Sequence, residues 1–442
     1  MIRQAVLLCG GMGTRLGERT VDMPKPLLDV SGRPLLDRTI EMLAAQGVEH
    51  FLLAAGFRGD LIEERYRDQP IAGATIETII EEEALGTAGC LHLLADRLEE
   101  EFLLVYADIF LDFDVVPLAE RHQNSGALAT LLVRQSDHPW DSHLVDARED
   151  GTVREFVFKQ EEGRLYRNLG NAAFYALNRR ILDFIPEGQK SDYGKNVFPA
   201  ALAAEEKLVT YELPPGQWVR DMGTPDRLEV VERYLERRRL IAAARREPRT
   251  IDTVFLDRDG TINVHDGHLA SWDQFEFLPG ALDGIRRLTE AGKRLVVITN
   301  QPAIARGLAT VEAVEDIHAR MCAAIEEAGG KIEAVYYSPF HPETHHGEGV
   351  LEFRRASDCR KPGTGMILQA VEELGLDLAS SVMVGDTAND ILAGRFSGIR
   401  TCLVGNLHLQ EELAPDYAAV SLAEVADAIL SGALDPPDPG TA

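Results

Sequence analysis

Cysteine is scarce in this sequence, with five residues in a chain of 442, at Cys9, Cys90, Cys322, Cys359 and Cys402. An odd number of widely spaced cysteines forms no disulfide framework, which disfavours a secreted scaffold and fits a reducing cytosol. Long apolar runs are also missing. None approaches the roughly 20 residues needed to cross a membrane, and the one at the amino terminus is too short for a signal peptide. We therefore expect a cytoplasmic protein.

Basic residues are also few relative to acidic ones. The chain has 45 lysines and arginines and 72 aspartates and glutamates, which gives a net charge of −27. Such a surface repels polyanions unless basic residues gather locally, so a general nucleic-acid binder is disfavoured. The rest of the composition, 45% hydrophobic and 26% charged, is typical of a globular protein. A length of 442 residues predicts two or three folding units, and we find no internal repeat.

Short apolar runs of strand length recur through the first half of the chain, with an amphipathic helical stretch at residues 35–46. These runs cover residues 5–9, 51–55, 102–106 and 128–133. The alternation predicts a parallel α/β sheet. A segment rich in arginine and glutamate follows at residues 234–248, and we interpret it as a solvated helix rather than a basic ligand site.

The alternation begins again after this segment, which predicts a second doubly wound α/β domain. Its expected strands cover residues 253–256, 294–299, 334–337 and 381–384, and its expected helices cover residues 279–291, 310–328 and 365–374. We therefore divide the chain into a first domain at 1–235, a linker helix at 236–249, a second domain at 250–432 and a disordered tail at 433–442.

A glycine-rich turn, Gly10-Gly11-Met12-Gly13-Thr14-Arg15-Leu16, follows directly on the first expected strand. Backbone N–H groups in such a turn can approach phosphate oxygens without interference from Cβ atoms, and Arg15 adds a positive charge. A tight turn without a ligand is the alternative. Shortly afterwards, Pro24-Lys25-Pro26 stiffens the backbone and fixes the direction of the lysine. Together the two segments predict a cradle for a polyphosphate.

These two segments resemble the opening signature of the sugar-1-phosphate nucleotidyltransferases, a Gly-Gly-x-Gly-Thr-Arg-Leu loop followed by Pro-Lys-Pro. The resemblance extends to Glu82-Glu83-Ala84-Leu85-Gly86-Thr87-Ala88-Gly89 and to Trp218-Val219-Arg220-Asp221-Met222-Gly223-Thr224-Pro225. It covers about residues 1–235 and implies a Rossmann-like nucleotidyltransferase fold. In the family reaction, a sugar phosphate attacks the α-phosphate of a nucleoside triphosphate and pyrophosphate leaves.

By this resemblance, Arg15 and Lys25 hold the triphosphate, while Asp108 and Asp221 share a Mg²⁺ ion. For Asp108, an exposed strand end or a helix cap is the alternative. The resemblance also implies that the glycine-rich turn and later segments bind nucleotide and sugar, through Gly10, Gly11, Gly13, Thr14, Glu83, Gly86, Thr87, Lys159 and Asn171. One departure bears on the sugar, because Phe158 replaces a carboxylate that could bind its hydroxyls.

Two carboxylates two residues apart follow an apolar strand in Phe255-Leu256-Asp257-Arg258-Asp259-Gly260-Thr261. This arrangement lets one carboxylate attack phosphorus while the other moves a proton. Three further segments follow in order, Thr299-Asn300, Arg360-Lys361-Pro362 and Gly385-Asp386-Thr387-Ala388-Asn389-Asp390. Surface turns rich in aspartate and glycine could explain one such motif, but not the whole series.

The series resembles the haloacid dehalogenase superfamily of phosphohydrolases, which implies a haloacid dehalogenase-like fold with a minimal cap. By this resemblance, Asp257 is the nucleophile, and Asp259 is the acid toward the leaving sugar oxygen and then the base for water. A Mg²⁺ ion is held by Asp257, by the backbone carbonyl of Asp259 and by Asp386. Asp390 supports the metal shell.

The same resemblance assigns the phosphoryl oxygens to Thr299 and Lys361. Within the superfamily, the chain resembles the D-glycero-D-manno-heptose 1,7-bisphosphate 7-phosphatases and their histidinol-phosphatase relatives over about residues 250–430. The segments that carry this likeness are Thr299-Asn300-Gln301, Ile304-Ala305-Arg306-Gly307, His341-Pro342 and Cys359-Arg360-Lys361-Pro362. They imply that Asn300, Arg306 and Arg360 contact the substrate, with the two arginines at its distal phosphate.

Those relatives usually carry a structural zinc loop, with ligands in Cys-x-His and Cys-x-Cys. Here the aligned positions read Ser338-Pro339-Phe340 and Ser357-Asp358-Cys359, which leaves one thiolate where a closed zinc site needs four ligands. We therefore predict that this zinc ion is absent. A rebuilt site that joins Cys359 to His341, His345 and His346 is the alternative.

A phosphatase joined to a sugar-1-phosphate nucleotidyltransferase makes chemical sense if the product of the first is the substrate of the second. We therefore expect a bifunctional enzyme whose second domain removes the 7-phosphate of heptose 1,7-bisphosphate, and whose first domain joins heptose 1-phosphate to a nucleotide. The Leu-Gly-Thr-Ala-Gly segment is similar to that of mannose-type and heptose-type transferases, which favours GTP. We expect no nucleic-acid or membrane partner, and the oligomeric state stays open.

Two alternatives to this hypothesis remain. In the first, the transferase uses mannose 1-phosphate or another hexose 1-phosphate and is fused to a histidinol-phosphatase-like or other sugar-phosphate phosphatase. In the second, the phosphatase-like domain is regulatory and has lost its catalysis. The catalytic carboxylates and lysines discriminate between enzyme and scaffold, and the phosphatase set is complete.

Metal analysis of the purified protein tests the prediction about zinc. Because three of the four aligned ligand positions lack a zinc-binding side chain, we expect no stoichiometric zinc by mass spectrometry after dialysis. Cys359→Ser is the matched variant, and it should leave the metal content unchanged. One tightly bound zinc ion per chain would contradict the prediction and indicate the rebuilt site.

Overall fold

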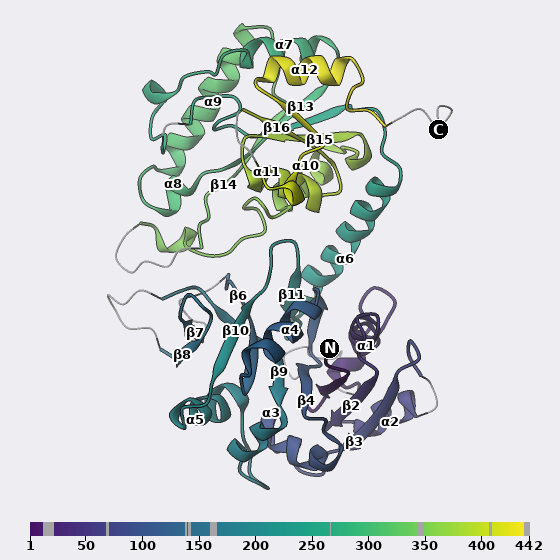
Figure 1. The fold of residues 1–442 in the computed structure, drawn as a ribbon. Helices are drawn as coiled ribbons and strands as arrows, with labels where there is room; N and C mark the ends of the chain where they lie inside the picture. Colours follow the sequence, from purple (N-terminus) through teal and green to yellow (C-terminus); the bar gives the residue numbers. More distant parts are fainter. Residues whose placement is uncertain are drawn as a thin grey trace. The chain divides into compact units, whose positions relative to one another are not determined.

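The computed structural model describes residues 1–11, 22–67, 70–137, 139, 143–159, 166–265, 267–342, 349–405 and 409–436. The chain divides into two compact units, Met1–Leu235 and Glu236–Ala442. The boundary falls inside helix α6 (Pro225–Arg246), so one continuous helix contributes residues to both units (Figure 1).

A nine-stranded sheet forms the centre of the first unit, and seven of its strands run in the order β10-β6-β9-β4-β1-β2-β3 (Figure 1). β1 pairs in parallel with β2 and β4, whereas β9 runs antiparallel between β4 and β6. The sheet is therefore mixed: the expected parallel pairing is present from β4 through β1 and β2 to β3, and β9 is an antiparallel strand within it. The strands are β1 (Gln4–Leu8), β2 (His50–Ala55), β3 (Thr75–Ile80), β4 (Glu101–Tyr106), β6 (Ala129–Arg134), β7 (Leu144–Ala147), β8 (Val153–Val157), β9 (Gly170–Asn178) and β10 (Leu208–Glu212).

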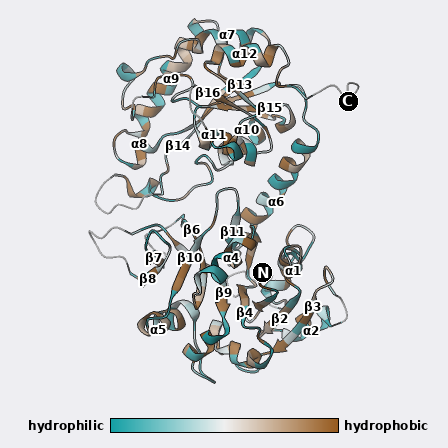
Figure 2. Ribbon diagram, in the orientation of Figure 1, coloured by the Kyte–Doolittle hydropathy of each residue, from teal (hydrophilic) through white to brown (hydrophobic). Residues whose placement is uncertain are grey.

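Helices cover both faces of this sheet, because successive strand residues point to opposite sides. Leu7 packs into the core on one face and Val6 into the core on the other. The first core includes residues of α1 (Leu35–Ala44), α2 (Gly59–Tyr66) and α4 (Val116–Ser125), and the second includes residues of α3 (Gly86–Gly89) and α5 (Phe198–Ala203). Figure 2 shows hydrophobic residues concentrated in the strands of both units.

A small two-stranded sheet lies beside the large one and positions two acidic residues. β5 (Ile109–Asp112) pairs antiparallel with β11 (Trp218–Asp221), with Asp221 opposite Ile109. The ring of Trp218 stacks on Tyr234 of α6, with 4.2 Å between ring centroids. The register therefore places Asp221 beside the turn that precedes β5.

The second unit contains a six-stranded parallel sheet in the order β14-β13-β12-β15-β16-β17. This arrangement confirms the predicted α/β fold class for this half of the chain. The strands are β12 (Thr253–Leu256), β13 (Arg294–Asn300), β14 (Ala334–Ser338), β15 (Ser381–Gly385), β16 (Arg400–Val404) and β17 (Tyr417–Ala419).

The sheet of the second unit also has a core on each face. One core includes residues of α7 (Ala281–Glu290), α9 (Val311–Glu327) and α12 (Leu422–Leu430), and the other includes residues of α10 (Gly365–Leu374) and α11 (Ala388–Phe396) (Figure 1). The short helix α8 (Pro302–Ala305) follows β13. β12 lies between β13 and β15, so the chain changes direction across the sheet at β12. Ligands of open α/β sheets bind at such a switch point, beyond the carboxyl ends of the strands.

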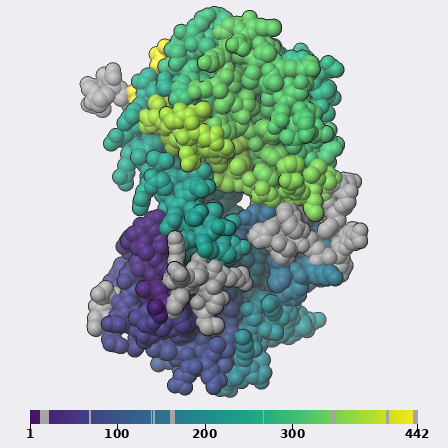
Figure 3. All heavy atoms as spheres, turned by 180° about the vertical axis from the view of Figure 1, so that it is seen from behind, coloured from purple at the N-terminus to yellow at the C-terminus, as the bar shows by residue number. Residues whose placement is uncertain are grey.

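The carboxyl terminus is ordered further than the sequence predicted. The disordered tail was expected from residue 433, but Leu434 is 6% exposed and the carboxylate of Asp435 accepts a hydrogen bond of 2.9 Å from the backbone N–H of Ile251. Residues 437–442 lie outside the described part of the chain. Residues near the amino terminus, purple in Figure 3, reach the surface of the first unit.

Within the described ranges, no helix combines the length and the apolar character that crossing a bilayer requires.

Candidate active sites

The second unit gathers carboxylates at the carboxyl end of its sheet. Asp257 directly follows β12, Asp386 follows β15, and Asp390 lies in the first turn of α11. One oxygen of each lies within 4.8 Å of the others. Among the described residues, these three carboxylates are close enough together to hold a metal ion. The backbone N–H of Asp257 donates to Val384 at 2.9 Å, which extends the pairing of β12 with β15 to the site.

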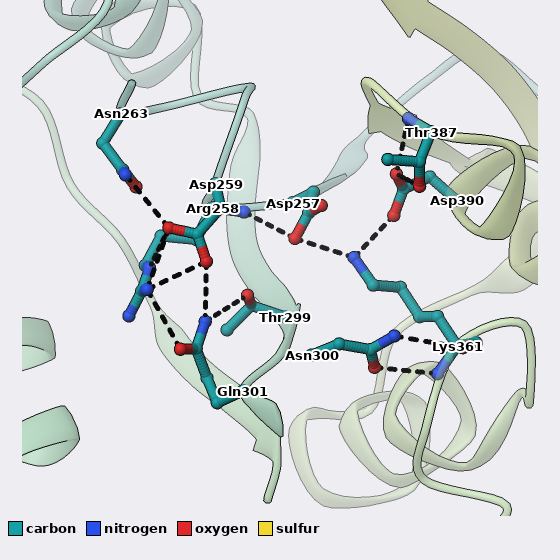
Figure 4. Close-up of polar contacts among 10 residues, drawn as sticks. All are labelled: Asp257, Arg258, Asp259, Asn263, Thr299, Asn300, Gln301, Lys361, Thr387 and Asp390. Carbon is teal, nitrogen blue, oxygen red and sulfur yellow. Dashed lines mark hydrogen bonds and ion pairs between the residues drawn. The ribbon is translucent and has the colours of Figure 1, made fainter. Parts of the chain in front are cut away.

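Lys361 lies between two of these carboxylates, as Figure 4 shows. Its Nζ atom is 2.7 Å from Oδ1 of Asp257 and 2.5 Å from Oδ1 of Asp390, and the residue is 2% exposed. Burial alone would lower the pKa of Lys361, but the two carboxylates outweigh it and raise this pKa. The ammonium group therefore stays charged.

The side chain of Asn300 holds the backbone of Lys361. Its Nδ2 donates to the carbonyl of Lys361 at 3.0 Å, and its Oδ1 accepts from the N–H of Lys361 at 2.9 Å. Asp390 is fixed as well, because its Oδ2 accepts from the backbone N–H and the hydroxyl of Thr387. Asn300 thus holds the backbone of Lys361, and its contact with substrate stays a prediction.

The carboxylate cluster has the charge and the free oxygen that a divalent cation needs. Three carboxylates face one ammonium group, which leaves two negative charges. Burial and the Asp390 carboxylate raise the pKa of Asp257 to about 7 and that of Asp386 to about 6. The buried Oδ1 of Asp386 has no hydrogen-bond partner among the described residues. Carboxylate oxygens are the ligands that Mg²⁺ prefers, so the cluster fits this ion.

The turn after Asp259 depends on glycine at one position. Gly260 has a φ angle of +82°, and a Cβ atom there would lie 2.0 Å from Oδ2 of Asp386. Only glycine therefore permits both the left-handed turn and the close approach of Asp386.

Asp259 is held by a network that the sequence did not reveal. Its carboxylate accepts hydrogen bonds from Nη2 of Arg258 at 2.9 Å, from Nε2 of Gln301 at 2.9 Å and from Nδ2 of Asn263 at 3.0 Å. Burial alone would raise the pKa of Asp259, but Arg258 and the two amides outweigh it and lower this pKa. Figure 4 shows this group apart from the pair formed by Asp257 and Lys361. The placement of Arg258 between two motif aspartates was the available sequence signal.

The remaining predicted residues of this unit lie around the same sheet edge. Thr299 is 1% exposed, and its Oγ1 accepts from Nε2 of Gln301 at 2.9 Å. Arg306 contacts Nε2 of His268 at 2.8 Å, and Nη1 of Arg360 donates to the carbonyl of Phe340 at 3.3 Å. No contact in the described structure joins either arginine to Asp257.

A second buried lysine organises the first unit. Lys25 lies in a 3₁₀-helix at Lys25–Leu27 and is 5% exposed. Its Nζ atom is 2.6 Å from Oδ2 of Asp108 and 3.8 Å from Oδ1 of Asp221. The other oxygen of Asp221 pairs with Arg227, a residue that the motifs did not identify. The structure therefore brings together Lys25 and both predicted metal ligands.

The charges of this cluster balance, because two carboxylates face two cations. The side chains of Asp108 and Asp221 are 38% and 42% exposed, so both can reach a ligand. This donor set fits a Mg²⁺ ion that arrives with phosphate groups, since their charge restores the negative excess.

The described part of the glycine-rich turn is Gly10 and Gly11, and the predicted residues Gly13, Thr14 and Arg15 lie outside the described residues. Gly10 follows β1 closely, and a Cβ atom on it would lie 3.3 Å from Oε2 of Glu81. Glu81 also accepts from the N–H of Leu85 at 2.8 Å, which holds the start of the second predicted segment. Glu83 within that segment is exposed.

The segment from Gly86 docks closely on a later loop. Gly86 has a φ angle of +80°, and a Cβ atom there would lie 2.4 Å from the carbonyl oxygen of Ser191. The hydroxyl of Thr87 donates to Oδ2 of Asp192 at 2.9 Å. Glycine is required for this approach, and the contact ties Thr87 to Asp192, which the motifs did not identify.

The first unit contains a cavity of about 500 Å³ that Asp221 helps to line. Two of the predicted residues, Asn171 and Asp221, line it, and Nδ2 of Asn171 donates to the hydroxyl of Tyr175 at 2.9 Å. Phe158 also lines it and meets the ring of His143 edge-on, with 5.3 Å between centroids. Further lining residues that the sequence motifs missed are Tyr106, Arg134, Asp192, Lys195, Arg220 and Arg227. Lys159 is exposed and is not among the lining residues.

Comparisons with known proteins agree with this division. A family model described as Nucleotidyl transferase matches residues 4–238, and one described as HAD-hydrolase-like matches residues 358–426. The D-glycero-beta-D-manno-heptose-1,7-bisphosphate 7-phosphatase of Yersinia pestis is 38% identical over 184 residues, which cover 41% of this chain and 96% of that protein. Its namesake from Escherichia coli strain K12 is 38% identical over 185 residues, covering 41% and 95%. HddC from Yersinia pseudotuberculosis, a solved structure, has a TM-score of 0.46 and 23% identity, covering 53% of this chain and 100% of its own.

The chain thus joins two enzymes of phosphorus chemistry, a nucleotidyltransferase and a phosphomonoester hydrolase. It belongs to the nucleotidyl transferase family, whose model matches more than half of its length. Its second unit belongs to the family of the D-glycero-beta-D-manno-heptose-1,7-bisphosphate 7-phosphatases. The two family resemblances inferred from the motifs are confirmed.

The metal fit predicts that Mg²⁺ stabilises the second unit in the absence of nucleotide. Asp386→Asn removes one of the negative charges that balance the ion, so it should weaken Mg²⁺ binding by about tenfold or more in isothermal titration calorimetry. The shift of the melting temperature by Mg²⁺ should shrink in parallel. Asp273→Asn, at an exposed position, is the control. Equal affinities for the Asp386 variant and the control would show that the cluster does not hold the ion.

Proposed function

We propose that this chain carries out two steps of heptose-nucleotide synthesis. The second unit hydrolyses the 7-phosphate of D-glycero-D-manno-heptose 1,7-bisphosphate, and the first unit transfers a nucleotidyl group from GTP to the heptose 1-phosphate that remains. The observation that carries this proposal is the presence, in one chain, of a unit 38% identical to 7-phosphatases and a nucleotidyltransferase unit. The product of the hydrolysis retains the 1-phosphate that a nucleotidyl transfer requires.

In the hydrolysis, a carboxylate oxygen of Asp257 attacks the 7-phosphorus, and the bond from phosphorus to the sugar oxygen breaks. Both the N–H of Arg258 and the Nζ of Lys361 donate to Oδ1 of Asp257, at 2.7 Å each, which fixes the rotation of the carboxylate. Mg²⁺ at the carboxylate cluster supplies the charge that lets two anions approach. Thr299 and Lys361 would bind the phosphoryl oxygens, and Asp390 would support the metal site.

Asp259 moves the proton in both halves of this reaction. It donates a proton to the departing sugar oxygen, and afterwards it takes a proton from the water that attacks the aspartyl phosphate and frees Asp257 and inorganic phosphate. The cations and amides that lower its pKa suit the second half. The dianionic ester raises this pKa as it binds, which suits the first half.

In the transfer, the phosphate oxygen of the sugar attacks the α-phosphorus of the triphosphate, and the bond to the β-phosphate oxygen breaks to release pyrophosphate. Lys25 and Arg15 neutralise the phosphates, while Asp108 and Asp221 hold a Mg²⁺ ion. Gly10, Gly11, Gly13 and Thr14 hold the phosphates, and Glu83, Gly86 and Thr87 hold the base and sugar of the nucleotide.

The cavity of the first unit accepts the sugar phosphate in one orientation. Arg134, Arg220 and Arg227 gather near Asp221, where the nucleotide must lie, so they face the phosphate. Asp192 also lines the cavity, and its carboxylate accepts a hydrogen bond from Thr87. Because Phe158 stands where relatives have a carboxylate, Asp192 and Asn171 provide the acceptors for the sugar hydroxyls. Lys159 approaches the sugar phosphate from outside this lining.

Several wider features belong to the same proposal. The zinc loop of the relatives is absent from this chain. Arg306 and Arg360 bind the distal phosphate of the bisphosphate, and Asn300 contacts the substrate. The enzyme works in the cytoplasm, in accord with its scattered cysteines. It binds sugar phosphates and a nucleoside triphosphate, and it needs neither nucleic acid nor membrane.

The two activities should separate by mutation. Asp257→Asn should lower phosphate release from the bisphosphate by about a thousandfold or more, because the nucleophile is lost. The same variant should form sugar nucleotide from heptose 1-phosphate at the normal rate. Lys25→Ala should release phosphate normally but slow pyrophosphate release by about a hundredfold. Phosphate and pyrophosphate assays, each with its own substrate, measure these rates.

If either variant, correctly folded, loses both activities, the model of independent sites is wrong. A panel of sugar bisphosphates, with each product offered the four nucleoside triphosphates, then tests the substrate. Preference for a hexose bisphosphate would favour the alternative that the transferase uses mannose 1-phosphate or a similar sugar.

The orientation of the sugar phosphate predicts the effect of Asp192→Asn. Loss of the charged acceptor should raise KM for the sugar 1-phosphate by about tenfold or more and leave KM for the triphosphate unchanged. Asp183→Asn, an exposed substitution on a neighbouring 3₁₀-helix, is the control. An equal rise in both KM values would show that Asp192 supports the fold of the cavity and does not select the sugar.

A further inference from the structure

Arg258 is the largest fully buried side chain among the described residues, with 1% of its surface exposed, and it lies between the two motif aspartates in the sequence. A buried guanidinium group must find an acceptor for each donor, because unpaired donors away from water are costly. Nε and Nη2 donate to Asp259, and Nη2 also contacts Oε1 of Gln301 at 3.0 Å. This leaves Nη1, which has a different partner.

The partner of Nη1 is His318 on α9, at 2.9 Å from Nε2. His318 is 6% exposed and lies on the buried face of the helix with Val314 and Met321. Burial and the charge of Arg258 lower the pKa of His318 to about 3. Arginine can only donate, so Nε2 accepts and the ring carries its proton on Nδ1.

The same arginine also orients Gln301. Because Oε1 of Gln301 accepts from Arg258, its Nε2 must point the other way, where it donates to Asp259 and to Thr299, each at 2.9 Å. A single guanidinium group thus determines where the Asp259 carboxylate lies and how the amide beside Thr299 is turned, as Figure 4 shows for these residues.

We propose that His318 is a positioning residue for proton transfer by Asp259, and that it acts through Arg258. This inference rests on the proposed role of Asp259 as acid and base. When His318 accepts from Nη1, the guanidinium plane is anchored on the side away from Asp259. Without that anchor, Arg258 turns to satisfy Nη1 elsewhere, and the Asp259 carboxylate and Gln301 turn with it.

Misplacement of Asp259 has a recognisable kinetic consequence. A sugar alkoxide is a poor leaving group and needs a proton as it departs, whereas 4-nitrophenolate leaves without one. Attack by Asp257 is the same for both esters. A fault confined to Asp259 therefore slows release of the sugar in the first half of the reaction and spares release of 4-nitrophenolate. The second half, in which Asp259 takes a proton from water, is common to both esters, so the comparison has to be made on the first half alone.

The experiment measures the rate at which the leaving group is released from each ester in a single turnover, with enzyme in excess, for His318→Leu, His318→Gln and Asp259→Asn of the full chain. His318→Leu should lower the rate of heptose 1-phosphate release about tenfold or more relative to the rate of 4-nitrophenolate release, since general acid catalysis contributes at least that factor. His318→Gln, whose amide oxygen can accept from Arg258, should restore most of the loss. Met321→Leu, on the same buried face of α9, is the matched control and should change neither rate. Hydrolysis of 4-nitrophenyl phosphate reports in each case that the second unit is folded.

The outcomes separate this inference from the function on which it rests. If Asp259→Asn slows only the sugar ester and His318→Leu slows both esters equally or neither, the inference is overturned and the role of Asp259 stands. If Asp259→Asn slows both esters equally, Asp259 is not the acid toward the sugar oxygen, and the inference about His318 is overturned as well. A loss in His318→Leu that His318→Gln does not restore would likewise overturn it, because the hydrogen bond to Arg258 would not be its cause.

Discussion

A buried ammonium group between two carboxylates holds each of the two sites together. Lys361 joins Asp257, at the end of β12, to Asp390 on α11. Lys25 joins Asp108 to Asp221 in the same way. Carboxylates gathered in a low dielectric repel one another and would take up protons, so a cation among them is a condition of their remaining charged.

The difference in charge between the sites matches the difference in their chemistry. Around Lys361 the carboxylates exceed the cations by two charges, and this excess can retain a divalent ion before any substrate binds. Around Lys25 the charges cancel, because Arg227 pairs with the second carboxylate. Here the triphosphate has to bring negative charge with it. In the proposed function, a protein with a net charge of −27 binds highly anionic substrates because cations are concentrated at its two sites.

Local features of this chain could be predicted from its sequence, and long-range ones could not. The strand at Thr253–Leu256 has the predicted bounds because its four buried residues, three of them apolar, are followed by a turn. The motif aspartates could be found because a single turn fixes their spacing. β9 escaped prediction because Gly170–Asn178 is rich in glycine, alanine and asparagine, which carry little strand preference. Pairing with β4 and β6 on both sides overrides this weak local preference.

The hydrogen-bond network around Asp259, the proposed acid and base, is the part of the site that the spacing of motif residues does not predict. Arg258 is visible in the motif, but the histidine that completes its hydrogen bonds lies 60 residues away on α9. The cavity of the first unit presents the same difficulty, because Arg134, Asp192 and Arg220 come from separate elements. A turn of the backbone at the end of β12 is enough to place Asp257 beside the other carboxylates of the cluster. The state of a proton depends on every charge and acceptor packed around it, so that property is set by the fold as a whole.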